Sequence, residues 1–249
     1  MWFDLFKDLW LERRRPIFFW CAAGLGWNIF AALAYPAVQG EEWLDRLLTW
    51  FALQSGTQKG YWLLVLMVLG SPIIGGGYAF LEGIHLFKGR GVRQMLAFLL
   101  AYPLPRWEVY LSRVVYLFSA SFLLVLCIFT SGTALTYFSA NPMPGGMWRM
   151  WTASILLVFL LGLAGVLVGN LGASRWMDRL AGLLVLGWLY LPYVQNSTAG
   201  LVRLSPLFYV LGETPTNQTF VMENGLILFL LCAIVGVLGG FAFERLELN

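Results

Sequence analysis

The stretch Trp151–Leu171, with the sequence WTASILLVFLLGLAGVLVGNL, decides the fold of this chain. It contains no Asp, Glu, Lys or Arg, and it has the length of about 20 residues that an α-helix needs to cross the hydrocarbon core of a bilayer. Comparable apolar blocks recur along the 249 residues, with shorter polar segments between them. These blocks predict a polytopic membrane protein of α-helices, since a β-barrel would instead show segments of about 10 residues with alternating polarity.

The composition argues against a soluble domain. Hydrophobic residues make up 59% of the chain and charged residues only 12%, whereas soluble domains are typically about 45–50% apolar and about 25% charged. The net charge of +3 is too small to indicate a nucleic-acid partner, and no basic tract alternates with aromatic residues. The predicted fold class is therefore all-α, with the lipid bilayer as the surroundings.

Six transmembrane helices are predicted within a single transmembrane domain, residues 1–249. The spans cover residues 16–38, 61–81, 109–131, 151–171, 180–194 and 220–243. Pro72 and the Gly75–Gly77 run interrupt the second span, which predicts a kink or a close helix contact because neighbouring groups re-satisfy the freed backbone.

Two further glycine pairs, Gly165/Gly169 and Gly236/Gly240, also permit close approach of helices. We expect these glycine pairs to serve ordinary packing between helices, and the alternative is that they form the interface of a dimer. Ionisable residues are nearly absent from the depths of the spans, which argues against an ion-coupled carrier.

Residues 1–15 predict an amphipathic helix in the membrane interface. Aromatic and leucine side chains, among them Trp2, Phe6 and Trp10, recur on one helical face, and charged residues take the other. The alternative is a short cytosolic helix packed on a partner. Residues 39–59 mix charged residues with Trp and Leu, so we predict a second short amphipathic helix on the opposite membrane surface.

The distribution of Lys and Arg predicts that both termini are cytosolic. With the six predicted spans, twelve of the 16 Lys and Arg residues lie on the side of the membrane that holds the N-terminus. The other four lie on the opposite side of the membrane: Arg46, Lys59, Arg149 and Arg203. Cytosolic segments carry the excess of basic residues in membrane proteins. This bias requires an even number of spans, and six crossings of a cell membrane satisfy it.

The longest polar interruption, residues 82–108, is predicted to hold a short cytosolic helix over residues 92–100. Its apolar residues recur at helical spacing: Val92, Met95, Leu96 and Leu99. Pro103 and Pro105 end it, because the residue before a proline is disfavoured in a helix. An apolar stripe in water needs a partner, and a groove on another protein is one solution. The alternative is a helix that lies on the bilayer surface.

This region carries an ordered set of features. An acidic residue ends the second span, a basic stretch with glycines follows, and an apolar helix is closed by a P-x-x-R-x-E-like turn. The residues are Glu82, Lys88–Gly91, Val92–Leu100 and Tyr102–Glu108. Together they resemble the first cytoplasmic loop of ABC-2 type transporter permeases, the membrane subunits of ATP-binding cassette exporters.

The resemblance extends over essentially the whole chain through loose motifs. The run Leu204–Tyr209 before the last span is similar to the family's outer loop, and the exit Phe241–Leu246 is similar to its cytosolic terminus. The chain departs from the family at Gly91-Val92, where Gly-Thr is usual, and at Arg113, where Lys is common.

By this resemblance, the helix over residues 92–100 is a coupling helix that seats in a groove of a separate ATP-binding subunit. The docking contacts that the family implies are Val92, Arg93, Met95, Leu96, Leu99 and Leu100. The implied coupling-loop motif comprises Glu82, Gly91, Pro103, Arg106 and Glu108. A second, smaller cytosolic contact comprises Arg175, Asp178 and Arg179. The helix over residues 1–15 would brace the coupling helix at the membrane surface.

Catalytic, metal and cofactor motifs are not found in the sequence. There is no GxxxxGK[ST] loop, so ATP and Mg²⁺ would be held by two partner ATPase subunits and not by this chain. There is no HExxH or GxSxG motif, and the single histidine, His85, stands beside a membrane boundary. The three cysteines lack CxxC spacing, so neither a metal site nor a disulfide is predicted.

The sequence thus predicts the permease subunit of an ATP-driven exporter in the cell membrane. A second copy of the chain, or a similar permease, would complete the substrate path, and the apolar, aromatic spans favour an amphiphilic cargo. The alternative is a membrane anchor or scaffold that recruits an ATPase to an envelope machine without moving a solute. A third class, an integral membrane enzyme, would need a cluster of polar catalytic residues that the sequence does not show.

Overall fold

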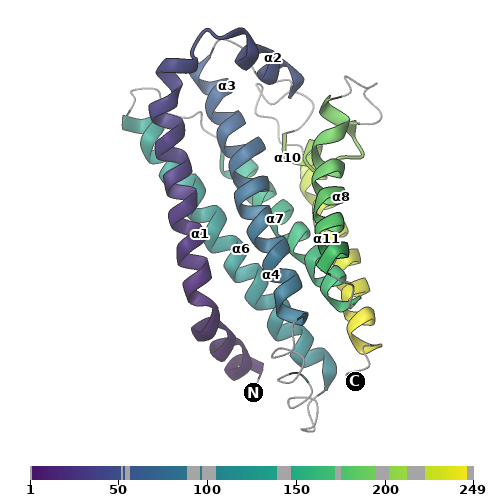
Figure 1. Cartoon of the computed structure of the whole chain (residues 1–249). Coiled ribbons are helices and arrows are strands. Elements are labelled where there is room, and N and C mark those ends of the chain that lie inside the picture. Colours follow the sequence, from purple (N-terminus) through teal and green to yellow (C-terminus); the bar gives the residue numbers. More distant parts are fainter. Residues whose placement is uncertain are drawn as a thin grey trace.

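The computed structural model describes residues 2–51, 53, 57–88, 96, 105–138, 147–171, 175–194, 202–211 and 222–245. These residues form helices and short turns, with no strand among them. The long helices run side by side as a bundle (Figure 1), and the start of the first helix and the end of the last lie at the same end of it. The described part of the chain therefore has the all-α architecture that the apolar blocks predict.

Five helices in the described residues are long and apolar enough to cross a membrane. They are α1 (Trp2–Val38), the continuous run of α3 (Gln58–Leu63), η1 (Leu64–Gly76) and α4 (Gly77–Phe87), then α6 (Arg106–Phe138), α7 (Met147–Asn170) and α11 (Met222–Glu244). The chain is a multi-pass helical membrane protein.

The predicted fifth span lies in α8 (Arg175–Val194), which belongs to the same bundle but is not among those five helices. Its first turns carry charged residues, which lower its apolar character. Two short helices, α2 (Glu42–Trp50) and α10 (Phe208–Leu211), are the remaining described elements.

The first helix is unbroken from Trp2 to Val38, although the sequence predicted a boundary at Pro16. A proline inside a helix removes one backbone hydrogen bond and tends to bend the helix, and Figure 1 shows the first turns of α1 inclined toward the rest of the bundle. Leu9 is buried there, and the Trp10 ring meets the Tyr116 ring of α6 at 6.1 Å between centroids. The apolar face of residues 1–15 thus packs partly on the chain itself, and its place in the membrane interface stays a prediction.

The η1–α4 segment and α7 are the most buried of the long helices and form the centre of the bundle. Glycines bring them together, because a Cβ at Gly83 or Gly165 would collide with backbone atoms of the facing helix. Gly169 lies almost as close to the backbone of α4. Gly165 and Gly169 therefore serve packing within the chain, the use that the sequence favoured over a dimer seam.

The backbone of η1 widens into a π-helix, a rare form that often accompanies function. Pro72 lies inside it and supplies no backbone N–H. Gly76 follows where the helix presses on α7, and a Cβ there would overlap the Leu161 side chain. The close helix contact predicted from the proline and glycines of this span is present.

The α2 helix lies at the end of the bundle opposite the termini (Figure 1). Its Leu44 and Leu48 side chains are buried, whereas Glu42 and Arg46 are exposed and form an ion pair one turn apart. The segment over residues 39–59 thus contains a short amphipathic helix, as its sequence pattern predicts.

The outward faces of α1, α8 and α11 are apolar and exposed. Large side chains stand on each of them, for example Phe18, Leu33, Leu184 and Phe229. Exposed apolar surface of this extent is unfavourable in water and favourable against lipid tails. These faces fit the surroundings of a membrane protein.

Candidate functional site

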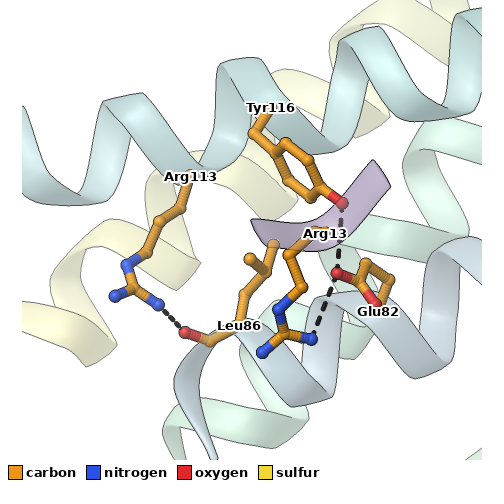
Figure 2. A network of polar contacts seen from close by, with 5 residues as sticks. All are labelled: Arg13, Glu82, Leu86, Arg113 and Tyr116. Atoms are coloured by element: carbon orange, nitrogen blue, oxygen red, sulfur yellow. Dashed lines mark hydrogen bonds and ion pairs between the residues drawn. The ribbon is translucent and has the colours of Figure 1, made fainter. Parts of the chain in front are cut away.

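The buried carboxylate of Glu82 is the centre of a polar cluster near the end of α4. Its side chain is only 5% exposed, and burial of a charge is costly unless the charge is paired and hydrogen-bonded. Two donors meet its Oε1 atom: Arg13 Nη1 of α1 at 3.3 Å and the Tyr116 hydroxyl of α6 at 3.3 Å. Figure 2 shows both side chains directed at this oxygen. One carboxylate thereby joins three membrane helices.

Arg113, on α6, is the second buried charge of this cluster. Its Nη1 donates to the carbonyl oxygen of Leu86 (Figure 2), and its guanidinium lies over the Phe87 ring at 5.4 Å from the centroid. The last carbonyl groups of a helix have no partner inside the helix and carry its partial negative charge. Arg113 therefore caps the C-terminal end of α4 and adds a cation–π contact to it.

Two further contacts tie helix ends at the same place. Lys88 Nζ, directly after α4, donates to both carboxylate oxygens of Asp178 on α8 at 2.6 Å, and both side chains are largely buried. Arg106 Nη1, at the start of α6, donates at 2.7 Å to the carbonyl oxygen of Glu244, where α11 ends. The polar cluster thus links α1, α4, α6, α8 and α11 at the end of the bundle that holds both termini.

Several residues predicted for the site lie in this cluster. Glu82, Arg106 and Asp178 make the contacts just described, while Glu108 is half-buried in the first turn of α6 and Arg179 is exposed in the first turns of α8. The backbone of Arg175 is helical. Most of the predicted coupling helix and its flanking motif lie outside the described residues, namely Gly91, Val92, Arg93, Met95, Leu99, Leu100 and Pro103.

Leu96 is the one residue of the predicted coupling helix that the structure describes. It is helical, fully buried within the chain and part of its apolar core. A side chain buried in this way has no surface left for a partner protein. Leu96 is thus a core residue of this structure, and the docking role predicted for it stays a prediction.

Sequence reasoning missed the partners of Glu82 and the capping role of Arg113. In the sequence, Arg13 belongs to the basic run before the first span, and Tyr116 falls within the predicted span over residues 109–131. Arg13 and Glu82 are 69 positions apart, so no local pattern could pair them. The acidic residue at the end of the second span and the basic run before the first span were the available signals.

The described residues contain no group of three or more His, Cys, Asp or Glu arranged to hold a metal ion. Comparisons with protein-family models, curated proteins and solved structures find no match for this chain. Its functional reading therefore depends on the polar cluster and on the resemblance of the residue 82–108 segment.

Proposed function

We propose that this chain is the membrane subunit of an ATP-binding cassette exporter, coupled to two separate ATPase subunits through the segment between α4 and α6. The observation that supports the proposal most is the buried Glu82, whose contacts join α4 to α1 and α6 just before that segment. A force applied to the segment would reach three membrane helices together. Coupling to a remote ATPase requires a connected set of packed elements of this kind.

The arrangement of the helices supports the six-span topology. The start of α1 and the end of α11 lie at the same end of the bundle (Figure 1), which requires an even number of crossings. The five long apolar helices give six crossings when α8 is added. Arg13, Lys88, Arg106 and Arg113 gather at this end, so we propose that it faces the cytosol of a cell membrane.

The substrate path would lie between two copies of the chain, or between this chain and a similar permease. The centre of the single bundle is filled by η1, α4 and α7, which leaves the outer faces for a path. The exposed apolar faces of α1, α8 and α11 suit a lipid-like, amphiphilic cargo better than a polar solute.

The docking surface proposed for the ATPase comprises Val92, Arg93, Met95, Leu99 and Leu100, with Arg175 as the smaller second contact. Arg179 lines a groove between α8 and the η1–α4 segment and is not assigned to the ATPase. Asp178 would hold α8 in place through Lys88 and would not reach the partner. ATP and Mg²⁺ would be bound by the ATPase, and the movement of the ATPase would be transmitted to this chain through the segment between α4 and α6.

Affinity purification of the tagged chain from the cells that express it tests the proposal. We expect an ATPase with a phosphate-binding loop to co-purify, and we expect Met95→Asp combined with Leu99→Asp to lower its recovery by about tenfold or more, as loss of interface anchors does. Trp43→Asp is the matched control, because Trp43 is exposed on α2 at the other end of the bundle. Undiminished recovery with the double variant would contradict docking through this segment.

Reconstitution separates export from the scaffold alternative. The complex in lipid vesicles should hydrolyse ATP faster when an amphiphilic cargo is added. Hydrolysis that is indifferent to every amphiphile tested would favour a scaffold that only recruits the ATPase.

A further inference from the structure

A groove of about 250 Å³ lies between α8 and the η1–α4 segment. Its walls are apolar, with Pro72, Ile73, Phe80 and Leu81 on one side and Val185, Leu186 and Leu189 on the other. Ile73, Leu81 and Leu186 are each more than two-fifths exposed. The groove therefore opens on the outer surface of the bundle, where lipid tails would lie.

The charged residues of the groove gather at the start of α8. Asp178 and Arg179 line it there. Both carboxylate oxygens of Asp178 accept from Lys88 at 2.6 Å, so this negative charge is neutralised within the chain. Arg179 is exposed and has no acidic partner in the part of the chain that the structure describes. Among the described residues, the groove thus combines an apolar interior with one net positive charge at its mouth.

We propose that this groove binds an acyl chain of an anionic phospholipid from the surrounding leaflet, with the lipid headgroup against the Arg179 guanidinium. The apolar walls select a hydrocarbon chain, and a single cation near the bilayer surface favours an anionic headgroup over a zwitterionic one. The bound lipid would fill the space between α8 and the central η1–α4 segment. This site does not depend on the exporter proposal.

Gly77 offers a selective way to fill the groove. It lines the groove, and a Cβ placed on it meets nothing within 4 Å. Gly187, on α8, also has open space around its missing Cβ but does not line the groove. Gly77→Leu should therefore place side-chain atoms in the lipid site from a Cβ position that is free, and Gly187→Leu is its matched control.

Native mass spectrometry of the full chain in detergent tests the proposal with equal amounts of phosphatidylglycerol and phosphatidylcholine that carry the same acyl chains. The wild-type chain should retain phosphatidylglycerol about two- to fivefold better, the range expected of one partly exposed ion pair. Arg179→Gln should remove this preference, whereas Arg14→Gln, at another exposed arginine, should keep it. Gly77→Leu should lower retention of both lipids severalfold, and Gly187→Leu should behave as wild type.

Three results would overturn the site. They are equal retention of the two lipids by the wild-type chain, an undiminished preference in Arg179→Gln, and undiminished retention by a monodisperse Gly77→Leu variant. Arg179 is exposed and lacks a described partner, so its substitution tests the headgroup contact even if the glycine variant fails to fold. No ATP or partner subunit enters the assay, so failure here leaves the exporter proposal intact.

Discussion

Replacing Glu82 with Gln is the sharpest perturbation of the polar cluster. The amide keeps the volume of the side chain and can still accept the hydrogen bond from Tyr116, but it removes the negative charge that Arg13 meets at 3.3 Å. The variant therefore isolates the charge of Glu82 from its size and from its hydrogen bond.

The cost follows from burial and geometry. Breaking a buried ion pair from one side typically costs about 3–5 kcal/mol because the other charge stays buried. Here the Arg13 side chain is 20% exposed, which lowers this cost. The 3.3 Å between Arg13 Nη1 and Glu82 Oε1 is also long for a charge-assisted hydrogen bond, which is typically about 2.7–2.9 Å. We therefore expect a loss of about 2 kcal/mol, or about 4–8 °C in Tm for a chain of this length.

A thermal melt with a thiol-reactive dye measures the loss, because Cys232 is buried and becomes reactive on unfolding. Glu82→Gln, Arg13→Gln and the double variant form a cycle that isolates the pair. The double variant should be no less stable than the worse single variant, with a coupling energy of about 1–2 kcal/mol.

The exposed pair Glu42–Arg46 is the matched control. Its atoms are closer, at 3.1 Å, but the side chains are 87% and 75% exposed, and exposed pairs contribute little. Glu42→Gln should shift Tm by no more than about 1 °C. A Glu82→Gln variant that melts with wild type, or additive losses in the cycle, would refute the view that the buried charge pair holds α1 to α4.

Three further predictions use other contacts of the bundle. Gly165→Ala should destabilise by about 1–3 kcal/mol through overpacking against α4, whereas Gly187→Ala, in open space, should be neutral or slightly stabilising in the same melt. Asp178→Lys should loosen α8, seen as faster amide hydrogen exchange over residues 175–194, and the added Lys88→Asp should restore protection; no gain from the swap would argue against the pair. Cysteines introduced singly as Arg46→Cys and Arg245→Cys should react with a membrane-impermeant maleimide from opposite sides of the membrane. Labelling of both from one side would contradict the proposed six-span topology.

The sequence alone established the class of this protein, because the length and polarity of each apolar block are local properties. A helix must satisfy its own backbone hydrogen bonds in lipid, so an uncharged block such as residues 151–171 has few other structures open to it. The short amphipathic helix α2 was also predictable, because its apolar and charged faces are both defined by the residues of a few consecutive turns. The orientation and the ATPase partner were inferred from basic residues and from a resemblance, and they remain proposals.

Only the tertiary structure decided which helices meet and what the charges near their ends do. α1 continues through Pro16 and meets α6 at the Trp10–Tyr116 ring contact, which no residue of α1 encodes by itself. Leu96, one of the six predicted docking residues, lies buried in the core. Glu82 acquired its role from Arg13 and Tyr116, on two other helices, because burial makes an unpaired carboxylate so costly that the surrounding fold must supply its partners.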